Sequence, residues 1–149
     1  MTHKPDDPRR LAHARRRSRR LAMQALYQWQ LTGYDPKDIL SQFKEDEDYG
    51  KCDGEYFRDL LMQITADAPA LDALLEPHLE RPMDRVDPVE AAILRVAAYE
   101  LRSRLDVPYR VVLNEAIDLA KKFGADQSHK FVNSALDRVA QQLRRLEMG

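Results

Sequence analysis

The sequence predicts an all-α protein. Gly occurs only five times, Leu and Ala are abundant, and no segment alternates apolar and polar residues as a half-buried strand would. Apolar side chains recur instead every three or four residues, which is typical of amphipathic helices. A chain of 149 residues has the usual length of one domain with a proper core. We therefore expect a compact single domain, residues 1–149, with about seven helices.

A central helix is predicted from Pro88 to about Leu101. Asp87 can cap this helix, Pro88 suits its first position, and Glu90 lies where a capping box places an acidic residue. The segment carries only three polar side chains after Val89, which point in different directions at 100° per residue: Glu90, Arg95 and Glu100. The helix has no continuous polar face. It should be buried, and each charge then needs a partner.

Six other helices are expected to start near residues 9, 36, 53, 69, 109 and 126. The first should run to about Leu31. Gly124 is expected to end the helix from residue 109 in the left-handed conformation, and Asp126 or Ser128 to cap the last helix. The acidic residues 45–50 are expected to form a surface loop, and residues 1–8 a flexible tail.

Charge is divided unevenly along the chain. Residues 1–20 contain eight Lys or Arg and two Asp, whereas the remainder contains sixteen Lys or Arg and twenty-three Asp or Glu. Arg predominates in the basic block, and its planar guanidinium suits phosphate and can stack on bases. A solubilising tail is the alternative, but nucleic-acid binding is favoured. Repulsion between the arginines predicts that this helical half is frayed until an anion binds.

The residues point to no catalytic or metal site. Cys52 is the only cysteine, the four histidines are scattered, and no glycine-rich phosphate loop is present. Asp126, Ser128 and His129 have the residue types of a hydrolytic triad, but capping explains them better. No apolar run is long enough to span a membrane, and the basic N-terminus lacks the apolar segment of a secretory signal.

Basic residues and aromatic rings gather again near residues 121–131, where the last two helices meet. Lys121, Lys122, His129 and Lys130 lie close in sequence to Phe123 and Phe131. Phosphate contacts fix the position of RNA, and an exposed ring can stack on an unpaired base. The pattern favours a core position for Phe123 and leaves Phe131 open between the core and the surface.

Three blocks of the sequence together resemble the NusB family of bacterial antitermination factors. They are RRRSRR at 15–20 followed by ALYQWQL at 25–31, ILRVAAYEL at 93–101, and an ordered series of short matches from Asp106 to Asn133. The resemblance covers nearly everything from Arg15 to about Ala140. It implies an all-helical fold of two packed helical halves.

The resemblance also implies a function. Such proteins bind the boxA segment of nascent RNA in the cytoplasm, together with NusE, a ribosomal small-subunit protein, and join an antitermination complex on RNA polymerase. They need no cofactor. The implied RNA-binding positions, with Lys121 added, are Arg15, Arg16, Arg17, Arg19, Arg20, Lys121, Asp126, Gln127, Lys130 and Phe131. The implied NusE-binding positions are Tyr27 and Glu90.

Two other classes of function remain open from the sequence. RNA cytosine methyltransferases carry a NusB-like domain, but this chain shows no cofactor-binding or catalytic-cysteine segment before Gly149. A helical scaffold that binds only protein is the third reading, with a homodimer that hides the arginines when RNA and NusE are absent.

Overall fold

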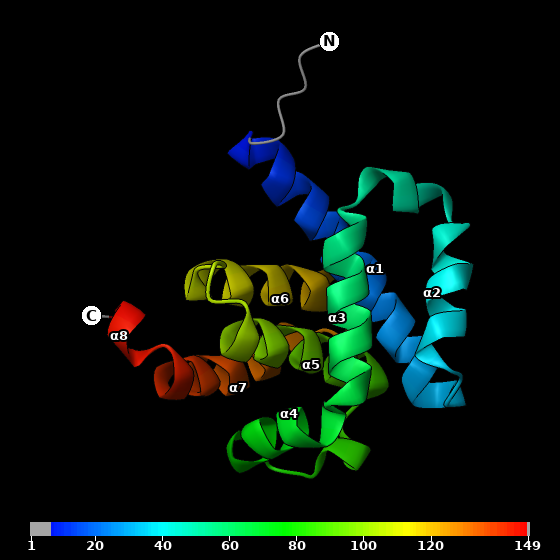
Figure 1. Ribbon diagram of the computed structural model, residues 1–149. Coiled ribbons are helices and arrows are strands. Elements are labelled where there is room, and N and C mark those ends of the chain that lie inside the picture. Colours follow the sequence, from blue (N-terminus) through cyan, green and yellow to red (C-terminus); the bar gives the residue numbers. More distant parts are fainter. Residues whose placement is uncertain (1–6, 149) are drawn as a thin grey trace.

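The computed structural model describes residues 7–148, which fold into eight α-helices and three short 3-10 helices (Figure 1). No strand occurs among these residues, so the prediction of an all-α fold is confirmed. The α-helices are α1 (Pro8–Thr32), α2 (Pro36–Lys44), α3 (Gly54–Ala66), α4 (Ala68–Leu75), α5 (Pro88–Ser103), α6 (Tyr109–Phe123), α7 (Ser128–Leu143) and α8 (Arg145–Met148). The 3-10 helices are η1 (Glu47–Lys51), η2 (Glu76–His78) and η3 (Met83–Arg85).

α1 is one continuous helix with well-formed ends. The Asp7 side chain accepts a hydrogen bond from the backbone N–H of Arg9, and Pro8 occupies the first turn. At the other end Gly33 has φ of 69°, and its N–H donates to the Trp29 carbonyl. The predicted fraying of the basic half is not seen, and Asp7 and Pro8, which we assigned to a flexible tail, cap and start the helix. The rest of that predicted tail, residues 1–6, lies outside the described residues.

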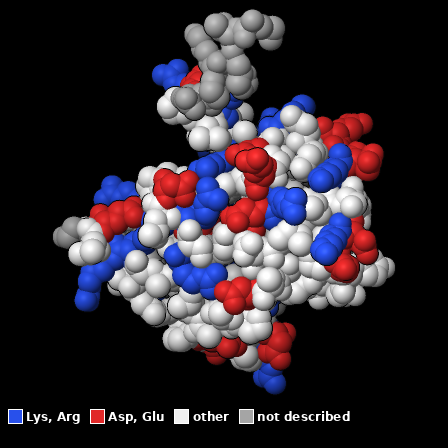
Figure 2. Space-filling model, in the orientation of Figure 1, with Lys and Arg blue, Asp and Glu red and all other residues white. Residues whose placement is uncertain are grey.

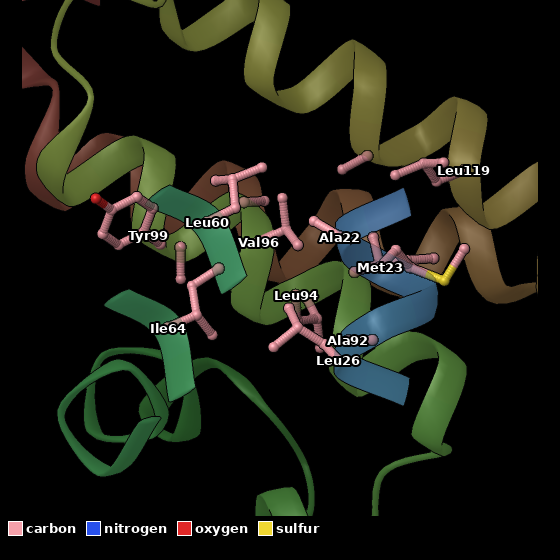
Figure 3. Packing of buried hydrophobic residues seen from close by; sticks show 14 of the residues in the cluster. Ala22, Met23, Leu26, Leu60, Ile64, Ala92, Leu94, Val96, Tyr99 and Leu119 are labelled. Atoms are coloured by element: carbon pink, nitrogen blue, oxygen red, sulfur yellow. The ribbon is translucent and has the colours of Figure 1, made fainter. Parts of the chain in front are cut away.

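α5 is the centre of the fold, as predicted. It packs against α1, α3, α4, α6 and α7, and eleven of its sixteen residues are buried. α1 to α3 form one helical half, and α4, α6 and α7 pack on α5 to form the other (Figure 1). Figure 3 shows the core where α1, α3, α5 and α6 meet, with the labelled side chains Ala22, Met23, Leu26, Leu60, Ile64, Ala92, Leu94, Val96, Tyr99 and Leu119.

Each polar side chain of α5 has a partner, as its burial requires. Both oxygens of Glu100 accept hydrogen bonds from Arg19 of α1. Arg95 forms a two-pronged ion pair with Asp72 of α4. These two ion pairs therefore link α5 to α1 and to α4. Glu90 departs from the predicted capping box, because its carboxylate accepts a hydrogen bond from Ser128 at 2.6 Å. The capping half of the prediction is confirmed, since Asp87 accepts from the N–H groups of Val89 and Glu90.

Three local predictions were wrong. Gly124 has φ of −90° and ψ of 177°, so it is extended rather than left-handed. Its site is close-packed, because an added Cβ would lie 2.6 Å from the Ser128 side chain. Neither Asp126 nor Ser128 caps α7. Gln127 is the N-cap residue, and its side chain makes no capping hydrogen bond. Ser128 is already helical, and its hydroxyl donates to Glu90. Part of the predicted acidic loop forms η1, which Asp46 caps.

Candidate nucleic-acid interface

A basic groove of about 210 Å³ lies between α1 and α6. Its α1 side is formed by His13, Arg16, Arg17, Arg19 and Arg20, and its α6 side by Glu115, Asp118, Leu119 and Lys122. Residues 13, 16, 17 and 20 recur at intervals of three and four, so one face of α1 supplies most of the positive charge. Acidic and basic groups are interspersed over the face of the molecule shown in Figure 2.

Arg16 is held at the groove by one edge of its guanidinium. Its Nε lies 3.2 Å from both carboxylate oxygens of Glu115, and 57% of its side chain is exposed. Because a guanidinium has five N–H donors in a planar fork, the other edge remains open to an anion from solvent. Glu115 thus orients Arg16 without occupying all of its donors.

Arg19 faces the core instead of the groove opening, with only 4% of the residue exposed. Its Nε and Nη2 donate to Glu100 at 2.9 Å, and its Nη1 donates to Glu115 at 3.4 Å. Burial opposes its charge, but Glu100 outweighs this effect and the pKa of Arg19 is raised. Tyr56 also donates to Glu100, and burial raises the pKa of its hydroxyl. Although the resemblance assigns Arg19 to RNA, its side chain has no surface to offer a phosphate.

Arg15 is half-buried on the same side of α1 as Arg19. Its guanidinium lies over the Tyr56 ring at 4.4 Å, and Nη1 donates to Asp106 at 3.1 Å. Its Nε is buried without a hydrogen-bond partner, 4.0 Å from Asp53. Cation–π contact and two carboxylates thus hold the charge of Arg15 against the body of the protein.

Arg20 connects the groove to the start of α7. This exposed arginine lies over the Phe123 ring, with its Cζ 5.3 Å from the ring centroid. Phe123 is half-buried and ends α6, and the loop that follows it leads directly to α7. The basic end of α1 and the junction before α7 are therefore neighbours, although about a hundred residues separate them in sequence.

The residues predicted at this junction are almost all exposed. Lys121, Asp126, Gln127 and Lys130 are open to solvent. Phe131 is half-buried: it packs against the core, and the guanidinium of Arg81 lies over its ring at 5.3 Å. One side of the Phe131 ring thus packs against the core and the other lies under the Arg81 guanidinium. Of the two positions that the sequence left open, core or surface, Phe131 takes an intermediate one.

Comparison with known proteins identifies the fold and its relatives. The NusB family profile matches residues 16–141, which include the groove and the junction. The chain belongs to the NusB family. The transcription antitermination protein NusB of Teredinibacter turnerae is 53% identical over 139 residues, which cover 93% of this chain and 95% of the relative.

Solved NusB structures have the same architecture. A structure of T. maritima NusB matches with a TM-score of 0.78 and 31% identity, over 89% of this chain and 95% of that one. A crystal structure of the antitermination factors NusB and NusE in complex with dsRNA matches with a TM-score of 0.70 and 27% identity, over 85% of this chain and 96% of that one.

The two positions that the NusB resemblance assigns to NusE differ in accessibility. Tyr27 is 38% exposed and lines a small apolar hollow with Met23, Val89 and Phe123. Glu90 is buried, and Ser128 at the start of α7 donates to it at 2.6 Å. Arg81 lies 4.0 Å from its other oxygen. Glu90 therefore joins the start of α5 to the start of α7, next to the exposed surface of Tyr27.

Several residues of this surface were not predicted from the sequence. His13 lies in the groove, and its spacing from Arg16, Arg17 and Arg20 would have revealed it. The same periodicity would have separated Arg15 and Arg19, which continue the buried stripe of Ala22 and Leu26. The carboxylate of Glu115 and the guanidinium of Arg81 reach the site from distant elements, and no local pattern in the sequence marks them.

Two further classes of feature are not found among residues 7–148. No group of three His, Cys, Asp or Glu side chains is arranged to hold a metal ion. No helix in this range is long and apolar enough to cross a membrane.

Proposed function

We propose that the protein is an RNA-binding antitermination factor of the bacterial cytoplasm. It binds the boxA segment of nascent ribosomal RNA transcripts together with NusE and helps to suppress termination by RNA polymerase. It acts by binding, without catalysis. The observation that carries this proposal is the contact of Arg20 with Phe123, which brings the arginine-lined groove next to the α7 junction on a NusB fold.

The proposed RNA surface divides into positioning and recognition residues. Arg16, Arg17 and Arg20 supply phosphate contacts along the groove, and Lys121 and Lys130 continue them past the junction. Asp126 and Gln127 offer hydrogen bonds to base edges, and Phe131 offers part of its ring for stacking. Arg15 and Arg19 act indirectly, because their ion pairs fix the face that α1 turns toward the groove.

The proposed NusE surface lies beside the RNA surface. Tyr27 and its apolar hollow provide an aromatic contact of the kind that anchors protein interfaces. Glu90 contributes by holding the start of α7 through Ser128, so the same carboxylate supports both surfaces. A relative solved as a complex of NusB, NusE and dsRNA supports the pairing of these two partners.

The affinity for boxA RNA as a function of salt concentration tests this proposal. Each phosphate contact on single-stranded RNA contributes about −0.7 to the slope of log affinity against log salt. The double variant R16A/R17A should therefore reduce the slope by about 1.4. A matched control, R138A/R145A, removes two exposed arginines near the end of the chain and should leave the slope unchanged. Equal slopes for R16A/R17A and the wild type would remove the groove from the RNA surface.

A further inference from the structure

The first turns of α1 precede the residues that the NusB family profile matches. The NusB profile matches from residue 16, whereas α1 begins at Pro8. About two turns of helix therefore precede the family segment. Residues 8–13 are exposed, and this end of α1 projects from the body of the molecule (Figure 1).

A second basic hollow, of about 520 Å³, lies between these turns and η1. Its polar lining is Asp7, Arg9, Arg10, His13, Arg17 and Lys51. Lys51 is the last residue of η1, and the chain after η1 is fixed to α1, because the Asp53 N–H donates to the Ala14 carbonyl and the Ser18 hydroxyl donates to the Asp53 carbonyl. The hollow is thus formed by two elements that are joined rigidly.

Among the described residues, the arginines and the lysine of this second basic hollow have no carboxylate ion-pair partner, unlike Arg15, Arg16 and Arg19. Arg15, Arg16 and Arg19 all form ion pairs with carboxylates of other elements. Within residues 7–148, no such pair involves Arg9, Arg10 or Lys51. The one carboxylate in the lining, Asp7, accepts a hydrogen bond from the backbone N–H of Arg9 as the cap of α1. The positive charge is therefore available to an external anion.

The second basic hollow is continuous with the groove between α1 and α6. His13 and Arg17 line both. From Arg9 to Arg17 the hollow follows α1 for about 12 Å. A polyanion that occupies the groove would therefore meet the second hollow without a break, whereas a separate small anion would have no reason to use both.

We propose that the second basic hollow binds the phosphates of RNA that flanks the boxA segment. This inference rests on the proposed function, since it places the continuation of the same RNA strand. Arg9, Arg10 and Lys51 contact phosphates without reading bases, so the extension lengthens the RNA footprint and does not change the recognised sequence.

Three RNAs test the inference: boxA alone, boxA with ten nucleotides added at its 5′ end, and boxA with ten added at its 3′ end. One extended RNA should bind the wild type with a steeper salt slope than boxA alone. In R9A/R10A the slope for that RNA should fall by about 1.4, while binding of boxA alone stays unchanged. R138A/R145A should keep the wild-type difference between the RNAs. Circular dichroism checks that α1 is retained, which the high helix propensity of Ala favours.

The possible results distinguish a failure of the inference about flanking RNA from a failure of the proposed boxA binding. Equal binding of all three RNAs by the wild type would overturn the inference but leave the proposed function standing. An equal loss of boxA and extended RNA in R9A/R10A would also overturn it, because the hollow would then belong to the boxA site. Failure of the wild type to bind any of the RNAs would overturn both the inference and the proposed function. Weak RNA binding with tight binding of an acidic peptide at Arg9 and Arg10 would assign the hollow to a protein.

Discussion

Neighbouring arginines in the block at residues 15–20 have opposite environments. Arg16 keeps most of its side chain in solvent, whereas Arg19, three residues later, is buried against Glu100. A buried ion pair contributes little net stability, but loss of one partner leaves an uncompensated charge in the core. The composition of the block therefore indicates binding to a polyanion. Only the helical period separates the exposed arginines, which can contact it, from the buried ones.

This difference predicts the effect of two substitutions on stability. Arg19→Ala leaves Glu100 buried without its ion pair and should lower the free energy of unfolding by about 3–5 kcal/mol. Arg16→Ala removes an exposed pair and should change it by less than about 1 kcal/mol. Urea unfolding of both variants measures the two values. Similar losses in the two variants would contradict the assignment of Arg19 to the core.

Asp106 predicts a dependence of stability on pH. Hydrogen bonds from Arg104 and from Arg15 keep the pKa of its carboxyl below the usual value. The ionised form is thus favoured in the folded state, so its stabilisation is complete above the ordinary pKa of about 3.9 and disappears as the pH falls through the lowered value.

Asp106→Asn should therefore be less stable than the wild type at pH 7, by less than about 1 kcal/mol because the side chain is half exposed. The difference should shrink as the pH falls below the ordinary carboxyl pKa of about 3.9. Urea unfolding at several pH values between 2 and 7 measures it. A difference that stays constant over this range would mean that the carboxylate charge is not what stabilises the fold.

At the scale of elements, the end of α7 holds the end of α5. Arg144 is buried and donates hydrogen bonds to the carbonyl oxygens of Glu100, Leu101, Arg104 and Val107. The last carbonyls of a helix have no partner within the helix. Arg144 donates to two of them, those of Glu100 and Leu101, which accounts for the burial of its charge.

Arg144→Met should lower the free energy of unfolding by about 2–5 kcal/mol, because it leaves the carbonyls of Leu101 and Val107 without donors. Arg145→Met changes the adjacent exposed residue and should stay within about 0.5 kcal/mol of the wild type. Thermal and urea unfolding compare the two variants. A small effect of Arg144→Met would show that water satisfies these carbonyls.

Most helices could be predicted from the sequence, because apolar period, caps and prolines agree over their length. The starts of α2, α3 and α5 have the expected side-chain caps from Asp35, Asp53 and Asp87. The start of α7 could not be predicted, because Ser128 gives its hydroxyl to Glu90, a residue 38 positions away. A side chain that could cap a helix can instead be oriented by a partner distant in sequence, and only the tertiary structure shows which occurs.

At the scale of the whole molecule, α1 serves both the core and the proposed RNA surface. Its C-terminal half buries Leu21, Ala22, Ala25 and Leu26, and its N-terminal half carries the basic face. The existence of a polyanion site could be predicted from the uneven charge alone. The extent of the proposed site could not, because Glu115, Arg81 and Lys51 come from elements whose positions depend on the packing around α5.

The central claim is that one RNA strand occupies both the groove of α1 and the junction before α7. Photocrosslinking of boxA RNA with a reactive nucleotide placed in turn at each position tests it most directly. Nucleotides near one end of boxA should crosslink to residues 13–20 of α1, and nucleotides toward the other end to residues 126–131. Crosslinks confined to one of these segments, or found on α4 or α8 instead, would contradict the claim.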